Sequence, residues 1–301
     1  MERASRTGLA AAYTAICIIW GSTYLAIKVG LASFDPFFYA GLRYVLATVA
    51  GLVILRASRV PLTGPPARWI PAFAVGVLFV AVCNGMVFWA ETRLDSGYTA
   101  LLMTANPLWI AFFEVFVPGE SRLSRRGWLG LGIGLVGSVL LLEPWRSGRI
   151  ELGAALVVEL SVIIWSATAL WVRKIRDRYH PFALTVTQMA AGSVVLLGVA
   201  AGRGRALVGP VSWEALGGLG FLAVFGSLIA FAAYFYLLAH WPASRVATST
   251  YINPVVAVLA GWLLLGERVS MSMLGATAVI LAGVALVLRE EPQAAVEEER
   301  T

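Results

Sequence analysis

The stretches TANPLWI (residues 104–110) and YINPVVA (residues 251–257) each set an asparagine and a proline side by side inside a long apolar segment. A proline within a helix removes a backbone donor and clashes with the preceding turn, which costs about 3 kcal/mol in a water-exposed helix. The asparagine next to it needs hydrogen-bond partners of its own. Because this costly pair occurs twice, it indicates an internal repeat.

The composition is that of a membrane protein. The 301-residue chain is 59% hydrophobic and 13% charged, with a mean hydropathy of +0.80, which lies outside the range of soluble domains. Its net charge of +6 comes from short Lys and Arg clusters between apolar runs, so we expect no nucleic-acid partner. Cys17 and Cys83 sit inside apolar segments without metal-ligand spacing, so we expect them to be packing residues and expect no metal or other cofactor.

Ten apolar segments are long enough to cross roughly 30 Å of hydrocarbon as helices. They cover about 10–32, 37–56, 69–91, 96–117, 126–143, 152–173, 181–201, 214–238, 243–266 and 270–288. We therefore expect an all-α membrane protein with ten transmembrane helices, the first of which is too long to be a signal-peptide core. Lys and Arg are about twice as frequent at the N-terminus, after even-numbered spans and in the tail as in the opposite loops, which predicts that both termini are cytoplasmic.

The chain consists of two copies of one five-span unit. Four landmarks recur in order at shifts of 145 to 147 residues: Trp20 with Trp165, Pro36 with Pro181, Asn106-Pro107 with Asn253-Pro254, and Gly119-Glu120 with Gly266-Glu267. An odd number of spans makes the second copy enter the membrane from the opposite side. We thus expect two five-helix repeats of inverted topology, residues 1–150 and 151–301, the second ending in an acidic cytoplasmic tail (about 289–301).

Four stretches carry a resemblance to a known family. They are IIWGSTYLAIKVG (18–30), DPFFYAGLRYVLA (35–47), TALLMTANPLWIAFFEVFVPGES (99–121) and STYINPVVAVLAGWLLLGERVSMSMLGATAVILAGVALVL (249–288). Together they resemble the EamA-type transporters of the drug/metabolite transporter superfamily over nearly the whole chain. Within that family the chain is similar to bacterial exporters of amino acids and metabolites, including aromatic amino acids. The resemblance implies export; no residue by itself sets a direction.

Polar and aromatic residues at helical spacing near the centres of the spans are the candidate substrate site. They are Trp20, Tyr24, Asn84, Phe88, Thr99, Met103, Asn106, Trp165, Phe231, Tyr234, Thr250 and Asn253. The prolines are expected to free backbone carbonyls, such as that of Leu102, for a ligand's donors. Two alternatives stay open: the Asn-Pro pairs only fix kinks and helix contacts, which we favour, and the two central tryptophans only pack.

Charged groups inside the spans are costly and are functional candidates. Lys28 and Arg43 fall toward the ends of their spans, where snorkelling to the interface is a sufficient explanation. Glu159, within its span, either pairs with Arg43 or carries a coupling proton, and we favour the pairing. Glu120 and Glu267, just past two span ends, are expected to bind backbone or loop groups.

The function favoured by these patterns is a secondary transporter of the bacterial inner membrane, working by alternating access around a midplane cavity. The expected partners are the lipid bilayer and a small neutral or zwitterionic solute such as an amino acid, because anionic solutes need several deep cations. No P-loop, HExxH or GxSxG motif is present, so an intramembrane enzyme is a weak alternative. A non-transporting scaffold and a carrier of another metabolite or drug class are the others, while proton coupling and oligomeric state are left open.

Overall fold

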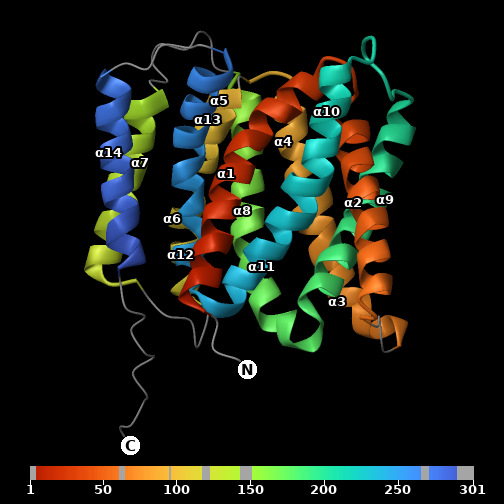
Figure 1. Cartoon of the computed structure of the whole chain (residues 1–301), viewed down its shortest axis with the longest axis horizontal. Coiled ribbons are helices and arrows are strands. Elements are labelled where there is room, and N and C mark those ends of the chain that lie inside the picture. Colours follow the sequence, from red (N-terminus) through yellow and green to blue (C-terminus); the bar gives the residue numbers. More distant parts are fainter. Residues whose placement is uncertain are drawn as a thin grey trace, which may run out of the picture.

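The structure, a computed structural model, describes residues 5–60, 65–94, 96–116, 123–142, 151–265 and 271–289. Nearly all of these residues lie in helices, which run up and down across one slab (Figure 1). Within these ranges the only β-type pairing is an isolated bridge between Phe34 and Leu207. The expected roles of Glu120 and Glu267 concern residues outside the described ranges.

In the first half of the chain, the described residues form seven α-helices and a π-helix. They are α1 (Arg6–Leu31), α2 (Pro36–Ala57), α3 (Pro66–Gly76), the π-helix η1 (Val77–Cys83), α4 (Asn84–Ala90), α5 (Ser96–Met103), α6 (Asn106–Glu114) and α7 (Arg125–Leu142). The segments α3, η1 and α4 follow one another without a break.

The second half has a similar order of elements. They are α8 (Leu152–Ile175), the short 3₁₀ turn η3 (Arg176–Arg178), α9 (Pro181–Arg203), α10 (Trp213–Phe221), the π-helix η4 (Leu222–Ile229), α11 (Ala230–His240), α12 (Ala243–Ala247), α13 (Ser249–Leu265) and α14 (Met271–Leu288). Here α10, η4 and α11 are continuous.

Six helical segments in the described residues are long and apolar enough to cross a membrane. They are Arg6–Leu31, Pro36–Ala57, Pro66–Ala90, Leu152–Arg178, Pro181–Arg203 and Trp213–His240. Large apolar side chains such as Val53, Val194 and Leu156 are exposed on them. That pattern suits a surrounding of lipid and not of water. The protein is an integral membrane protein, and its described residues are nearly all helical.

Helix starts follow local capping chemistry. Asp35 accepts hydrogen bonds from the backbone N–H groups of Phe37 (3.0 Å) and Phe38 (3.3 Å) at the start of α2. Pro36 takes the first helical position, where a missing N–H costs nothing. Ser212 caps α10 in the same way, accepting from Ala215 at 3.1 Å.

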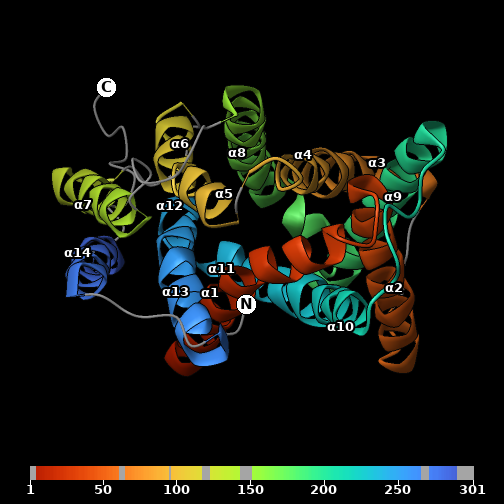
Figure 2. The same cartoon turned by 90° about the horizontal axis from the view of Figure 1, so that it is seen from above.

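The helices form a central group flanked by two edge pairs. Viewed from above, α7 and α14 lie together at one edge while α2 and α9 lie at the other (Figure 2). Between them, α1, α8, α11 and α13 surround an aromatic core that includes Phe79, Phe231 and Tyr234. The two halves of the sequence are interleaved, and neither forms a separate lobe.

The Asn-Pro pairs interrupt the two halves differently. In the first half, α5 ends at Met103 and α6 begins at Asn106, with Pro107 in its first turn. The Leu102 carbonyl accepts from the Ala105 N–H at 3.1 Å, so the expectation that this carbonyl is free for a ligand was wrong. The tight turn satisfies it locally. In the second half the break falls at Thr248, and Pro254 lies inside α13.

The two π-helices were not predicted from the sequence. Their wider turns alter the backbone hydrogen bonding. In each π-helix, one backbone carbonyl accepts a hydrogen bond from a side chain. Asn84 Nδ2 donates to the Phe79 carbonyl at 2.7 Å, and Ser227 Oγ donates to the Leu222 carbonyl at 2.8 Å. Both bonds reach back five residues.

The connection between α9 and α10 is joined to the turn between α1 and α2. The Asp35 N–H donates to the Ala206 carbonyl at 3.0 Å, and the Val208 N–H donates to the Ser33 carbonyl at 2.9 Å. Arg203 adds an ion pair to Asp35 at 3.3 Å. We call this set of contacts the strap; it ties the two halves together at one face of the slab.

Candidate functional site

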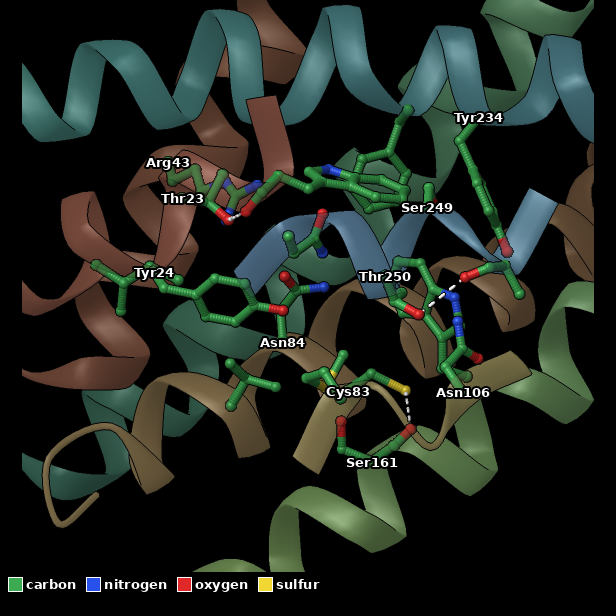
Figure 3. A pocket seen from close by; sticks show the side chains of 18 residues that line it. Thr23, Tyr24, Arg43, Cys83, Asn84, Asn106, Ser161, Tyr234, Ser249 and Thr250 are labelled. Atoms are coloured by element: carbon green, nitrogen blue, oxygen red, sulfur yellow. Dashed lines mark hydrogen bonds between the residues drawn. The ribbon is translucent and has the colours of Figure 1, made fainter. Parts of the chain in front are cut away.

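A cavity of about 70 Å³ lies in the central group of helices. It brings together ten of the predicted residues: Trp20, Tyr24, Asn84, Met103, Asn106, Trp165, Phe231, Tyr234, Thr250 and Asn253. Residues of both halves line it, and their polar groups surround the central space (Figure 3). A water molecule needs about 10–15 Å³ of such space, so the cavity has room for several waters or a small polar group.

Two predicted residues do not line the cavity. Phe88 is fully buried and packs against Tyr39, with ring centroids 5.7 Å apart. Thr99 is also fully buried. Spacing along a helix placed both on the correct stretch, but it could not distinguish the cavity wall from the packing behind it.

One wall of the cavity is a cluster of aromatic rings. Trp20 and Trp165, the matching tryptophans of the two halves, meet edge to face with centroids 5.8 Å apart. Phe231 lies 5.8 Å from Trp20 and 5.9 Å from Trp165, and Tyr234 lies 5.2 Å from Trp20. The rings pack against one another, so a bulky ligand would have to separate them.

The two asparagines differ in their contacts. Asn106 Oδ1 accepts a hydrogen bond from Ser166 Oγ on α8 at 2.9 Å. Asn253 is equally buried and lines the cavity, yet its Oδ1 has no hydrogen-bond partner. A buried acceptor without a donor costs about 1–3 kcal/mol. Asn253 is therefore better suited than Asn106 to contact a ligand.

Arg43 lies where the sequence analysis did not expect it. The side chain is 2% exposed and lines the cavity, so it does not snorkel to the interface. It donates to Ser227 Oγ at 2.8 Å and to the Gly226 carbonyl at 2.9 Å. The expected pairing with Glu159 was wrong, because Glu159 is half-buried and interacts with Trp109 instead.

Lys28 is held at the end of its helix by the backbone. Its Nζ donates to the carbonyls of Glu91 and Leu94, both at 3.0 Å. These carbonyls follow the C-terminal end of α4, where a cation is favoured by the helix dipole. The Glu91 carboxylate is fully buried without a hydrogen-bond partner.

The predicted site left out eight lining residues. They are Thr23, Ile27, Arg43, Cys83, Val87, Ser161, Ala247 and Ser249. Ser161 was recognised on the helical stripe of Trp165 but was not included in the predicted site, while Thr23 and Ile27 follow Trp20 at helical spacing, so periodicity could have found them. Cys83 is buried as expected and its Sγ contacts the Ser161 carbonyl at 3.4 Å, but it also faces the cavity.

Comparison with known proteins identifies the family. The EamA-like transporter family matches residues 7–143 and, a second time, residues 152–289. The chain belongs to this family. It is an EamA-like transporter of the drug/metabolite transporter superfamily, and the family domain occurs twice in it.

Relatives of this EamA-like transporter cover most of its length. An uncharacterized inner membrane transporter, YedA of Escherichia coli (strain K12), is 34% identical over 276 residues, which are 91% of this chain and 88% of that protein. A probable amino-acid metabolite efflux pump of Salmonella typhimurium (strain LT2) is 24% identical and is aligned over 89% of this chain and 91% of that protein. A protein of known crystal structure, 24% identical, has a TM-score of 0.78 over 94% of this chain and 99% of its own, and supports the fold.

Proposed function

We propose that this EamA-like transporter is a secondary transporter that exports small neutral or zwitterionic metabolites, foremost amino acids including aromatic ones. The observation that carries the proposal is the central cavity, in which an aromatic wall stands beside amide and hydroxyl groups from both halves of the chain. Rings suit apolar side chains, and amides and hydroxyls suit polar head groups. The name of the Salmonella relative, an amino-acid metabolite efflux pump, agrees with this substrate class.

The proposed architecture is ten spans in two inverted repeats, in the bacterial inner membrane. In Figure 1, α1 runs from the lower to the upper edge of the slab, and α8, its counterpart, runs the opposite way. Contacts also come in matched pairs, since α1 packs on α13 as α8 packs on α6. The first described helix begins, and the last ends, at the lower edge (Figure 1), which supports the expectation that both termini lie on one side.

Alternating access follows from this architecture. In inverted-repeat transporters the two repeats exchange conformations around a site at their interface. The cavity is lined by helices of both halves, and packed rings form one of its walls, as expected for a site at the interface of the repeats.

The test of this proposal is solute flux. Purified protein in proteoliposomes is loaded with labelled amino acids or other metabolites, with and without a proton gradient, and efflux is followed. Saturable flux of at least one amino acid is expected. An absence of flux for every solute would sink the proposal and favour a scaffold or an enzyme.

Replacing either central tryptophan tests how aromatic substrates are recognised. An aromatic contact is worth about 0.5–1.5 kcal/mol beyond simple burial. We therefore expect Trp20→Ala and Trp165→Ala each to reduce phenylalanine flux about two- to tenfold more than threonine flux. Trp213→Ala is the matched control because Trp213 is 85% exposed. Equal losses for both substrates would argue against stacking.

A further inference from the structure

The cavity contains an isolated charge. Among its described lining residues, Arg43 is the one charged side chain. It extends from α2 and lies beside Thr23 at one side of the space, while Asn106 and Tyr234 lie at the opposite side (Figure 3). A cation at this depth is costly unless something compensates it.

The protein groups around Arg43 are neutral. Its guanidinium donates to the Ser227 hydroxyl and the Gly226 carbonyl, and lies over the rings of Tyr44 at 4.8 Å and Phe88 at 5.9 Å. These contacts orient the guanidinium and lower the cost of burying it. They do not cancel its charge, and they leave other N–H groups of the fork for a further acceptor.

Two other buried carboxylates in the described residues have ionic partners, whereas Glu91 forms no ion pair there. The Asp35 carboxylate lies 3.3 Å from Arg203, and the Glu114 carboxylate lies 3.9 Å from Arg173. Within the same residues no Asp or Glu forms an ion pair with Arg43. Arg43 thus lacks an acidic partner and faces a cavity, where a ligand can provide one.

We propose that Arg43 binds the carboxylate of the transported substrate, so that one carboxylate is a required feature of every good substrate. The inference rests on the proposed transport function and specifies its chemistry. The planar guanidinium suits a carboxylate because it can donate two parallel hydrogen bonds. Since the described lining holds a single cation, phosphates and dicarboxylates are disfavoured.

Other polar groups of the cavity wall suit a donor group of the ligand. Ser161 Oγ, Tyr234 Oη and Asn253 Oδ1 line the cavity and have no hydrogen-bond partner. An ammonium group offers three N–H donors, and such oxygens can accept them. A cation and unpartnered oxygens in the lining of one cavity match the two charged groups of a zwitterion.

The test compares three molecules of one shape. L-Phenylalanine has both charged groups, L-phenylalaninamide lacks the carboxylate, and 3-phenylpropionate lacks the ammonium. Their binding to the purified full-length protein is measured by titration. We expect phenylalanine to bind about 10- to 100-fold more tightly than its amide, with phenylpropionate also tighter than the amide.

Variants then assign the preference to Arg43. Arg43→Gln should abolish the preference for phenylalanine over its amide, and Arg43→Lys should retain part of it. Arg203→Gln, which removes a cation outside the cavity, should leave the preference unchanged. If Arg43→Gln does not fold, the Lys variant and the wild-type ligand series carry the test.

Two results would overturn the inference. One is equal binding of phenylalanine and its amide to the wild type. The other is an Arg43→Gln variant that weakens all three ligands equally, which would make Arg43 only a structural support for η4. Either result can occur in a protein that still transports amino acids, whereas the lack of any flux would refute the proposed function itself.

Discussion

At the residue scale, the two halves differ at the position that faces each asparagine. Ser166 contacts Asn106, and Gly21, 145 residues earlier, approaches Asn253. A Cβ on Gly21 would lie 2.7 Å from Val256 and 3.1 Å from the Asn253 carbonyl, so the helices meet there without a side chain. Because glycine has no hydroxyl to offer, the amide oxygen of Asn253 stays available.

Alanine substitutions should separate the roles of the two asparagines. Asn106→Ala removes a buried hydrogen bond, so we expect the free energy of unfolding to fall by about 1–3 kcal/mol. Asn253→Ala removes an oxygen that has no hydrogen-bond partner, so we expect a smaller loss of stability, below about 1 kcal/mol. It should instead reduce amino-acid flux. Denaturant unfolding in detergent and proteoliposome flux measure the two effects, and the reverse assignment would contradict this reading.

The sequence predicted cavity residues well where they follow a pattern. Trp20 and Trp165 align between the halves, and helical spacing extends from them to neighbouring turns. Arg43 could not be placed in this way, because its partners Ser227 and Gly226 lie more than 180 residues away. Only the folded chain shows that α2 turns this side chain inward.

At the element scale, helices pack closely through glycines at the α7–α14 edge. A Cβ on Gly283 would lie 2.5 Å from the Gly134 nitrogen and 2.7 Å from the Gly130 carbonyl. Small residues at such contacts let helix backbones approach in a membrane, where the hydrophobic effect does not drive helices together. The edge pair therefore depends on the absence of side chains at these positions.

Gly283→Ala should disturb this contact. The added methyl group meets backbone atoms that cannot rotate away, and overpacking costs about 1–3 kcal/mol. Gly275→Ala is the control on the same helix, because nothing lies within 4 Å of a Cβ placed there. We expect a lower thermal midpoint in detergent for the first variant and an unchanged or higher one for the second. Equal midpoints would count against close glycine packing.

At the scale of the whole molecule, two cations connect the C-terminal ends of matching helices to neighbouring elements, one at each face. Lys28 and Arg173 are related by the same 145-residue shift as the central tryptophans. Lys28 joins α1 to the end of α4. Arg173 joins α8 to Glu114, whose carboxylate also accepts from the Ser244 N–H at 3.1 Å. The C-terminal end of α1 lies at the upper edge and that of α8 at the lower edge (Figure 1).

Removing either cation should open the cavity toward its own face. Charge-assisted hydrogen bonds are worth about 1.5–3 kcal/mol when buried, and less when exposed, as at Lys28. We therefore expect the accessibility of the cavity to rise about two- to tenfold. Cys83, which lines the cavity, is labelled with an impermeant maleimide from each side of oriented vesicles in a Cys17→Ser background.

Lys28→Met should raise Cys83 labelling from the face at the end of α1, and Arg173→Met should raise it from the other face. Lys174→Met, an exposed neighbour, is the control. If both variants raised labelling from the same side, the two cations would not be opposing closures.

The positions of helices were predictable because hydropathy and span length are local properties. The segments 37–56 and 181–201 correspond to α2 (Pro36–Ala57) and α9 (Pro181–Arg203). The strap could not be predicted, since it consists of backbone hydrogen bonds between loops of the two halves. It restricts separation of the halves at its face of the slab, so we expect their relative motion to pivot near it.

The paired π-helices also bear on the history of the chain. η4 begins 145 residues after η1, the offset that relates Trp20 to Trp165. A π-turn arises when one residue is inserted into an α-helix, and such an insertion turns everything beyond it by about 100°. Since both copies carry it at the same place, the insertion is most simply older than the duplication that produced the two halves. If one copy lost this inserted residue, the helix beyond the π-turn would rotate, and its cavity-lining residues would no longer match those of the other copy.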